Sequence, residues 1–451
     1  MGKAIDKLQN IKIVKTLTNI WRIEDLRSRI LITLLFVAIY RLGSYVVLPG
    51  IDTEALQGLR NQTTDSGLMS LLDMFSGGAF SKASIFALGI MPYISASIVM
   101  QLLGIAVPYF QKMQREGESG RRKMSQYTRY LTVPILVFQG IFYLINLKTQ
   151  TGGTALYTSQ DWNIFILYAT IILAAGSMFV LWLGERITDK GIGNGVSIII
   201  MIGIIARFPT AVYHEFDSCL KSGHGGLVMF LVEIVLFLVV IAAAILLVQG
   251  VRQVPVNYAK KIAGARQIGG ARQYIPLKPY AANVMPIIFA QAIMFIPVTL
   301  AQFSGSKLNP IVMQLIDNDS FVYNLIFAIL IILFTYLYTA ITINPVQMAE
   351  DMKRNNGFIP GIKPGKDTAD YIDKIMSRIT FPGSLFLAII AILPAFAGIF
   401  GVQREFAAFF GGTSLLILVG VVLDTLMQIE SHLMMRHYDG LLDTGRVRGE
   451  H

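Results

Sequence analysis

Cysteine and histidine are scarce in this 451-residue chain, and their scarcity removes two kinds of site. The single cysteine, Cys219, cannot form an intrachain disulfide. The five histidines, at positions 214, 224, 432, 437 and 451, lie far apart and show no spacing typical of a metal centre. We therefore expect neither a disulfide framework nor a bound metal.

Nucleotide-binding motifs are also missing. The stretch GIGNG at 191–195 is rich in glycine, but it lies in a short turn before an apolar run and no soluble strand precedes it. The stretch GKD at 365–367 lacks the spacing and the hydroxyl of a P-loop. We expect no cofactor and no enzyme activity, so the energy for any transport must come from a partner or from the membrane gradient.

Charged residues make up only 15% of the chain, whereas hydrophobic residues make up 54%. This balance excludes an ordinary soluble globular domain and indicates an integral membrane protein. A helix needs roughly 17 to 25 apolar residues to cross a bilayer. Ten such runs are expected to span, of which 191–206 is the shortest: 30–48, 83–107, 130–147, 162–184, 191–206, 227–249, 284–303, 321–343, 379–400 and 411–430.

The basic residues are unevenly distributed among the connecting segments. Of the 38 lysines and arginines, 30 lie in 1–29, 111–129, 185–190, 250–280, 344–378 and 431–451. Basic residues are retained on the cytoplasmic side, so we expect both termini there and see no cleavable signal peptide. The net charge of +10 follows mostly from this topology and does not indicate DNA binding.

Ten spans divide into two sets of five, separated by the polar stretch at 208–226. An odd number of spans in each half inverts the second half relative to the first. The second span of each half carries a Met-Pro pair, in GIMPYISAS at 89–97 and NVMPIIFAQA at 283–292. Matching interruptions indicate a transport path, although prolines are common in membrane helices and the match alone could be chance.

The segment 68–75 is too short to cross a bilayer, carries Asp73 and ends at Gly77 and Gly78. Glycine tolerates backbone angles that end a helix. Irregular backbone at membrane depth must be buried in protein or line water. We therefore predict a re-entrant half-helix that faces a cavity and can act as a stopper.

Six blocks carry a family resemblance. In chain order they are MFSGGAFSKASIFALGIMPYISASIVMQLL, GESGRRKMSQYTRY, WLGERITDKGIGNGVSIII, VNYAKK, GFIPGIKPG and GGTSLLILV. Together they resemble the SecY/Sec61-alpha family of protein-translocation channels over nearly the whole chain. The resemblance implies an all-α membrane protein of ten helices in two pseudo-symmetric inverted halves with a re-entrant plug.

The same resemblance implies a function. Such a channel passes unfolded secretory polypeptides across the bacterial cytoplasmic (inner) membrane and releases transmembrane segments into lipid through a lateral gate between spans two and seven. The implied parts are a cytoplasmic segment 1–29, halves 30–215 and 216–432, docking loops 250–280 and 344–378, and a cytoplasmic tail 433–451. The plug is expected at 68–80, with Leu68, Leu71, Leu72, Met74, Phe75, Gly77 and Gly78.

A pore for polypeptides needs an uncharged, stiff constriction that excludes water and ions. Isoleucine fits because its branched Cβ restricts χ1. Ile90 and Ile94 lie four apart and so share a helix face beside Pro92. By itself either would be read as a packing or lipid contact, but the resemblance places both in a pore ring with Ile200, Ile288 and Ile417.

Polar groups in apolar spans are the expected lateral gate: Ser95, Ser97, Gln139, Gln291 and, as a weaker candidate, Phe295. Hydrogen bonds between membrane helices contribute only about 0.6 to 2 kcal/mol. An incoming apolar segment can therefore replace them. The alternative is that these groups only hold neighbouring helices together.

The loop 252–278 holds six basic residues and no acidic residue, an excess over what topology needs. Ribosomal RNA is a matching partner, and the resemblance implies docking of the ribosome and of the motor ATPase SecA. In the second loop Lys363 stands where the family usually has arginine, and Ala265 replaces a common basic residue. The expected docking residues are Lys260, Lys261, Arg266, Arg272, Lys353, Arg354 and Lys363.

The resemblance implies further partners: the subunits SecE and SecG, the accessory proteins SecDF and YidC, membrane lipid and the transported proteins.

The main rival interpretation is an ion-coupled transporter of a small solute, which needs ionisable groups at membrane depth. The spans offer Asp424, with Arg41 and Glu233 nearer their ends. An intramembrane enzyme would need paired carboxylates or a Ser/His dyad, and Asp424 has no evident carboxylate partner in the sequence.

Overall fold

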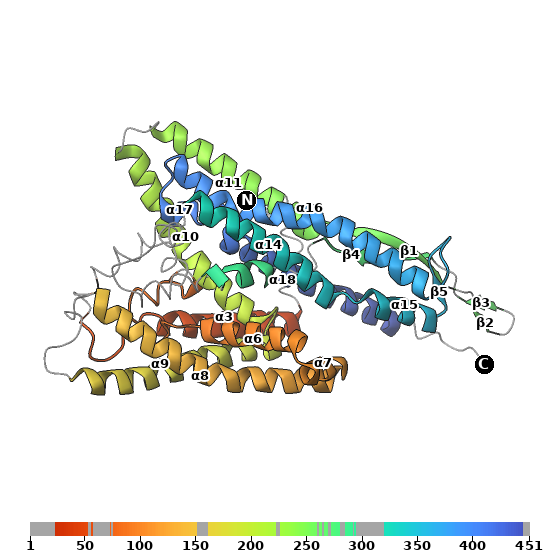
Figure 1. Ribbon diagram of the computed structural model, residues 1–451, viewed down its shortest axis with the longest axis horizontal. Coiled ribbons are helices and arrows are strands. Elements are labelled where there is room, and N and C mark those ends of the chain that lie inside the picture. Colours follow the sequence, from red (N-terminus) through yellow and green to blue (C-terminus); the bar gives the residue numbers. More distant parts are fainter. Residues whose placement is uncertain are drawn as a thin grey trace. The chain divides into compact units, whose positions relative to one another are not determined.

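The structure is a computed structural model that describes residues 23–52, 56, 73, 75–150, 161–221, 226–258, 261–263, 266–268, 272–279, 285–291, 293–294 and 320–444. The described chain is mostly helical and divides into two compact units (Figure 1). The first unit contains 1–209 with 421–451, and the second contains 210–420.

The first unit is a bundle of helices in which α6 packs on α8, α8 on α9 and α9 on α3 (Figure 1). Its core includes the fully buried side chains of Leu144, Phe165 and Leu173. Its helices are α3 (Glu24–Gly43), α6 (Met91–Ala106), α7 (Pro108–Arg115), α8 (Glu118–Gln150), α9 (Trp162–Lys190), the start of α10 (Gly195–Lys221) and the end of α18 (Gly412–Thr444).

The second unit is built around α16 (Lys366–Ile399), on which α14 and α15 pack, and which α11 and α17 also contact. Residues 285–291 and 293–294 are also helical. The other helices that begin in this unit are α11 (Gly226–Gln249), α14 (Phe321–Thr342), α15 (Pro345–Arg354), α17 (Arg404–Ala407) and α18.

Five short strands lie in the second unit. They are β1 (Arg252–Tyr258), β2 (Lys261–Ala263), β3 (Arg266–Ile268), β4 (Arg272–Leu277) and β5 (Gly357–Phe358). Strands β4, β1 and β5 form an antiparallel sheet, in which Val254 pairs with Ile275 and Asn257 with Phe358. Strands β2 and β3 form a separate hairpin.

Seven helices of the described chain are long and apolar enough to span a membrane, or eight if the bent pair α6 and α7 counts as one span. The seven correspond to the expected spans from 130–147 to 227–249 and from 321–343 to 411–430. Several extend beyond the apolar run, since α8 has 33 residues and α16 has 34. The expected span 284–303 lies largely outside the described residues.

Two expected spans have other boundaries in the structure. Helix α3 begins at Glu24 and ends at Gly43, and it is not among the seven helices that are apolar enough to span, so the span expected at 30–48 stays a prediction. The continuous span expected at 83–107 is wrong at its start, because the helix begins only at Met91. Gly89 has a φ of +51°, and Pro92 occupies the first turn, where a missing N–H is tolerated. Helix α6 ends before Pro108, and α7 leaves it at 101°.

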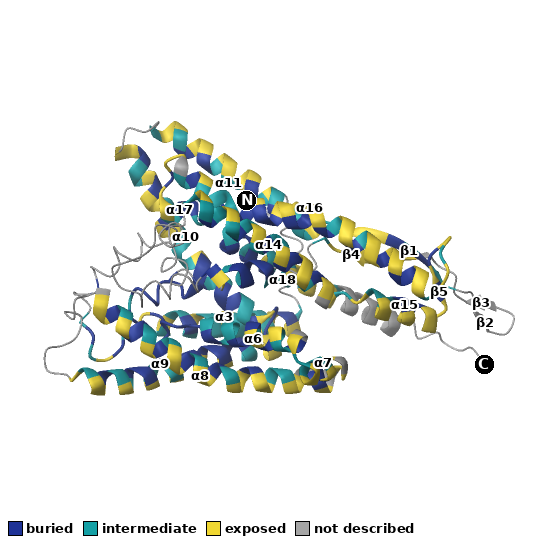
Figure 2. Ribbon diagram, viewed as in Figure 1, coloured by how far each residue is buried: buried dark blue, intermediate teal, exposed yellow. Residues whose placement is uncertain are grey.

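Many large apolar residues on the helices of both units are exposed, and Figure 2 shows exposed positions along these helices in yellow. On α11 the exposed fractions reach 71% for Val228, 60% for Val235 and 73% for Leu246. Exposed apolar surface of this extent is typical of helices that face lipid or a partner protein. The expectation of an all-α integral membrane protein is confirmed, and the short strands lie only in the connecting loops.

Candidate functional site

The break that the two glycines predict is present in the first unit. Residues 76–90 form successive turns, and Asp73 and Phe75 just before them are helical. Gly77 and Gly78 have φ values of +66° and +86°, which glycine adopts without strain. We call Asp73 together with residues 75–90 the glycine-break segment. Its side chains are mostly buried, and turn hydrogen bonds together with an isolated bridge between Ser84 and Val47 satisfy part of its backbone.

Asp73 is the charged centre of this segment and is fully buried. Its Oδ2 lies 2.6 Å from Nη2 of Arg207 on α10, and its Oδ1 accepts a 2.7 Å hydrogen bond from the Ser81 backbone N–H. Its carbonyl oxygen accepts hydrogen bonds from the Gly78 N–H and the Ser76 hydroxyl. A buried carboxylate is tolerated when it is paired and hydrogen-bonded in this way.

Three further side chains hold carbonyl groups of the segment. Arg41 of α3 donates to the Gly77 carbonyl at 3.0 Å, and Tyr40 donates to the Ser76 carbonyl at 3.2 Å. Tyr143 of α8 donates to the Phe80 carbonyl at 2.8 Å, and its ring packs edge-on against the Phe80 ring. Helices α3 and α8 thus satisfy backbone carbonyl groups that would otherwise be buried without partners.

The expected plug residues fall partly within this segment. Phe75 is buried, and Gly77 and Gly78 form the break. The other four, Leu68, Leu71, Leu72 and Met74, lie outside the described residues.

Each unit carries part of the expected pore ring. In the first unit Ile90 is the N-cap of α6 and is buried, and its carbonyl accepts the Ile94 backbone N–H at 3.1 Å. Ile200 on α10 is also buried. In the second unit Ile417 on α18 is buried and Ile288 is partly exposed. No charged residue belongs to the set.

The expected gate residues make polar contacts within each unit. The Gln139 amide donates to the Ser95 hydroxyl at 3.3 Å and thus links α8 to α6. Ser97 accepts from Gln101 on its own helix, also at 3.3 Å. In the second unit Gln291 donates to Thr413 of α18 at 2.6 Å. Phe295 lies outside the described residues.

The sheet brings the two expected docking loops together, because β1 and β4 come from the first loop and β5 from the second. Val254, Val256 and Leu277 of the first loop share a buried cluster with Met352, Ile359 and two residues of α16. Lys353 and Arg354, in the last turn of α15, and Lys363 are exposed. Lys261, Arg266 and Arg272 lie on β2, β3 and β4, and Lys260 lies outside the described residues.

Sequence reasoning missed several of these features. It noted Asp73 and Arg41 but paired neither with a partner, and it gave no role to Arg207, Tyr40 or Tyr143. The strands were missed too, although alternating Val254 and Val256 are typical of a half-buried strand.

Comparison with known proteins gives consistent matches. A family model described as SecY matches residues 84–426. Relatives described as protein translocase subunit SecY include that of Streptomyces galbus, 41% identical over 94% of this chain and 98% of the relative. That of Aquifex aeolicus is 39% identical, over 93% of this chain and 97% of the relative.

Solved structures agree with this in fold. One described as "The structure of a protein conducting channel" has a TM-score of 0.62 at 16% identity and covers 94% of this chain and 95% of its own. Another, "Sec61 in the Canine ribosome-channel complex from the endoplasmic reticulum", has a TM-score of 0.56 at 15% identity, with the same coverage. At such low identity these likenesses show a shared fold.

Proposed function

The chain belongs to the SecY family, and we propose from that premise that residues 68–80, which include the start of the glycine-break segment, are the plug of a polypeptide channel. The chain is the channel-forming subunit of a protein translocase and not an enzyme. The observation that supports the plug is the fully buried Asp73, which forms an ion pair with Arg207 of α10.

The plug works in this proposal because its anchors are few and polar. The Asp73–Arg207 ion pair and the hydrogen bonds from Arg41, Tyr40 and Tyr143 hold the segment closed. Each neutral hydrogen bond contributes only about 1 kcal/mol. A translocating chain can therefore displace the segment without unfolding the helices around it.

The pore ring is the constriction that the plug covers. Ile90, Ile94 and Ile200 come from the first unit, and Ile288 and Ile417 from the second. Their apolar side chains hold back ions when no polypeptide is present, since a narrow hydrophobic constriction excludes water. They also offer a passing polypeptide no hydrogen bonds that would slow it.

The lateral gate is proposed at α6 and the helix that contains residues 285–291. Ser95 and Gln139 meet across α6 and α8 in a 3.3 Å hydrogen bond, at the long end of the usual range. A bond of this strength is readily exchanged when a hydrophobic segment enters between the helices. Ser97, Gln291 and Phe295 complete the proposed set.

The two docking loops are proposed as the cytoplasmic contact surface. Because the β4-β1-β5 sheet and its buried cluster unite the two loops, Lys353 and Arg354 at the end of α15 lie on the same small folded element as Arg272 on β4. Lys261 and Arg266 lie on the separate β2–β3 hairpin. Exposed basic side chains bind RNA phosphates through counterion release. A relative of the same fold was solved in a ribosome-channel complex, so we propose the ribosome and SecA as partners here, with SecE and SecG as companion subunits.

The protein crosses the membrane several times, and we propose that both termini are cytoplasmic and that the membrane is the bacterial inner membrane. The solute-transporter alternative is not favoured, since the relatives are protein translocase subunits. Asp424, which that alternative needs at depth, is exposed on α18.

Reconstitution tests the proposal. Proteoliposomes that contain the chain with SecE and SecG receive SecA, ATP and a secretory precursor, and the measured quantity is the precursor protected from added protease. We expect protection that requires both ATP and this chain. A variant that replaces Lys353 and Arg354 with glutamate tests the docking loops, because weaker docking should lower protection. The proposal fails if the complete system protects no precursor while an established translocase does so in parallel.

A further inference from the structure

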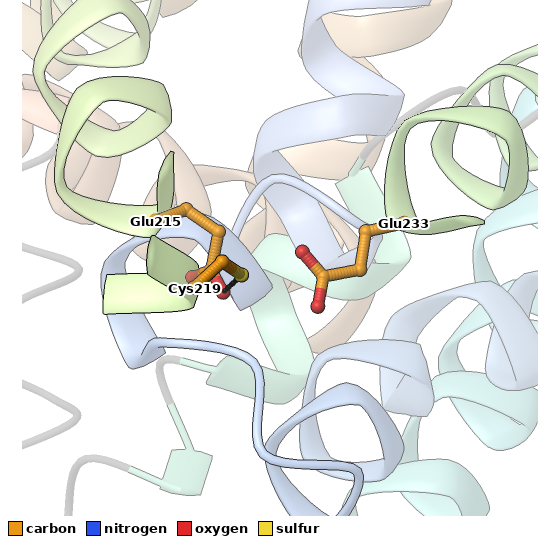
Figure 3. A group of neighbouring side chains, drawn as sticks. All are labelled: Glu215, Cys219 and Glu233. Carbon is orange, nitrogen blue, oxygen red and sulfur yellow. Dashed lines mark hydrogen bonds between the residues drawn. The ribbon is translucent and has the colours of Figure 1, made fainter. Parts of the chain in front are cut away.

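A cluster of three side chains in the second unit has no part in the proposed channel. Glu215 and Cys219 lie four residues apart near the end of α10 and therefore share a helix face. Glu233 reaches them from α11 (Figure 3). One ligand atom from each of the three lies within 4.8 Å of the other two. Their exposed fractions are 1% for Glu215, 7% for Cys219 and 5% for Glu233.

The two glutamates differ in their partners. Oε2 of Glu215 accepts a 2.8 Å hydrogen bond from the Gln403 backbone N–H, and Oε1 accepts from the Cys219 thiol at 3.6 Å. Oε2 of Glu233 is buried and has no hydrogen-bond partner in the described part of the chain. Figure 3 shows the Glu233 carboxylate directed towards the other two side chains.

This arrangement lacks a positive charge. Neither glutamate forms an ion pair with a described residue. Two carboxylates held together away from water are unfavourable when both are charged, so either one of them takes up a proton or a bound cation neutralises them. The orphaned oxygen of Glu233, aimed into the cluster, marks where that cation would bind.

We propose that Glu215, Cys219 and Glu233 bind a zinc ion that joins the end of α10 to α11. A thiolate with two carboxylates selects against Ca²⁺ and Mg²⁺, which take oxygen ligands. Zinc accepts sulfur and oxygen together and imposes no geometry through its d electrons. Two ligands at positions i and i+4 of one helix are a familiar half of a zinc site. On binding, the Cys219 thiol releases its proton to solvent.

The distances between the three ligand atoms fit a zinc site in which the ligands move closer together when the ion binds. Four ligands around zinc lie roughly 3 to 4 Å from one another, and the three atoms here already lie within 4.8 Å without the ion. A water molecule can take the fourth position. The Gln403 N–H orients the Glu215 carboxylate, as outer hydrogen bonds orient ligands in metal sites. The Gln403 amide also donates to the Ser218 hydroxyl at 3.0 Å, which fixes this turn of α10.

Metal content of the purified full-length chain tests the site. The protein is equilibrated with Zn²⁺, passed through a chelating resin and measured by elemental mass spectrometry. We expect about one zinc per chain, and a loss of at least about tenfold in Cys219→Ser and in Glu233→Gln. Asp217→Asn is the matched control, because Asp217 lies on the same turns of α10 but pairs with Lys221 instead. It should keep its zinc.

Cobalt substitution provides a second measurement that needs no activity. Because Cys219 is the only cysteine of the chain, a thiolate-to-cobalt charge-transfer band reports on this site alone. We expect the band in the Co²⁺-loaded chain and in Asp217→Asn, and no band in Cys219→Ser. A chain that retains no zinc overturns the proposal whether or not the variants fold, and so does zinc that Cys219→Ser retains in full.

Discussion

The ion pair between Asp73 and Arg207 should set how tightly the channel closes. Asparagine at position 73 keeps the size of the side chain and an acceptor for the Ser81 N–H, but it removes the charge that faces Arg207 across 2.6 Å. Removing one partner of a fully buried pair costs about 3 to 5 kcal/mol. The Arg207 side chain is 23% exposed and partly screened, so we expect about 2 kcal/mol here.

Under the plug proposal that loss acts on the closed state, because the pair would exist only while the segment is in its closed position. About 2 kcal/mol corresponds to a shift of about 30-fold in the equilibrium between the closed and displaced plug. The assay is ion leakage from proteoliposomes that contain the full channel without a precursor. Asp73→Asn should raise the leak by roughly 10- to 100-fold.

Two controls separate the pair from a general loss of folding. Asp217→Asn removes a carboxylate from the exposed Asp217–Lys221 pair and should leave the leak unchanged. Arg207→Gln combined with Asp73→Asn should leak less than the sum of the two single effects, since contacting charges are not additive. Equal leaks from Asp73→Asn and Asp217→Asn would refute the reasoning.

Three further predictions concern the hydrogen bond from Tyr143, the glycine at position 77 and the docking loops. Tyr143→Phe removes the 2.8 Å hydrogen bond to the Phe80 carbonyl and should raise the leak about fivefold, for a loss of about 1 kcal/mol; a leak equal to wild type would contradict this anchor. Gly77→Ala and Gly117→Ala both place alanine at a positive φ, of +66° and +76°, but only at position 77 would the new Cβ lie 2.6 Å from the Arg41 guanidinium. Gly77→Ala should therefore raise the leak more than Gly117→Ala. Replacing Lys353 and Arg354 with glutamine should weaken ribosome binding and reduce the salt slope of log K by about 2 in a titration, whereas Lys148→Gln should not.

Seven spanning helices were predictable because a long apolar run leaves few alternatives in a bilayer. Their ends were less predictable. Helices such as α8 and α16 continue past the apolar run into charged turns, since helical hydrogen bonds are local and need no lipid. The start of α6 was misjudged because 83–90 is apolar, while Gly89 and Pro92 decide its conformation.

In the candidate sites, too, local features were predictable from the sequence and long-range contacts were not. Gly77 and Gly78 predicted the break because a local backbone conformation depends on local residues. The contact between Asp73 and Arg207 joins positions far apart in the sequence, and no local pattern encodes it. Sequence reasoning also dismissed a metal site because the histidines are scattered. The spacing of Glu215 and Cys219 was visible, but the approach of Glu233 depends on how α10 and α11 pack.

The central claim, that a polypeptide passes the proposed pore ring, is tested most directly by photocrosslinking. A photoreactive amino acid replaces Ile90, which leaves Cys219 in place, and a secretory precursor is stalled during ATP-driven import. The matched control carries the photoreactive amino acid at Ile171 instead. Ile171 is 62% exposed on α9 and so faces outward, whereas Ile90 is 4% exposed at the start of α6. The account predicts an adduct at position 90 that requires ATP and SecA, and none at 171. A precursor that is demonstrably stalled yet crosslinks at neither position, or equally at both, would contradict it.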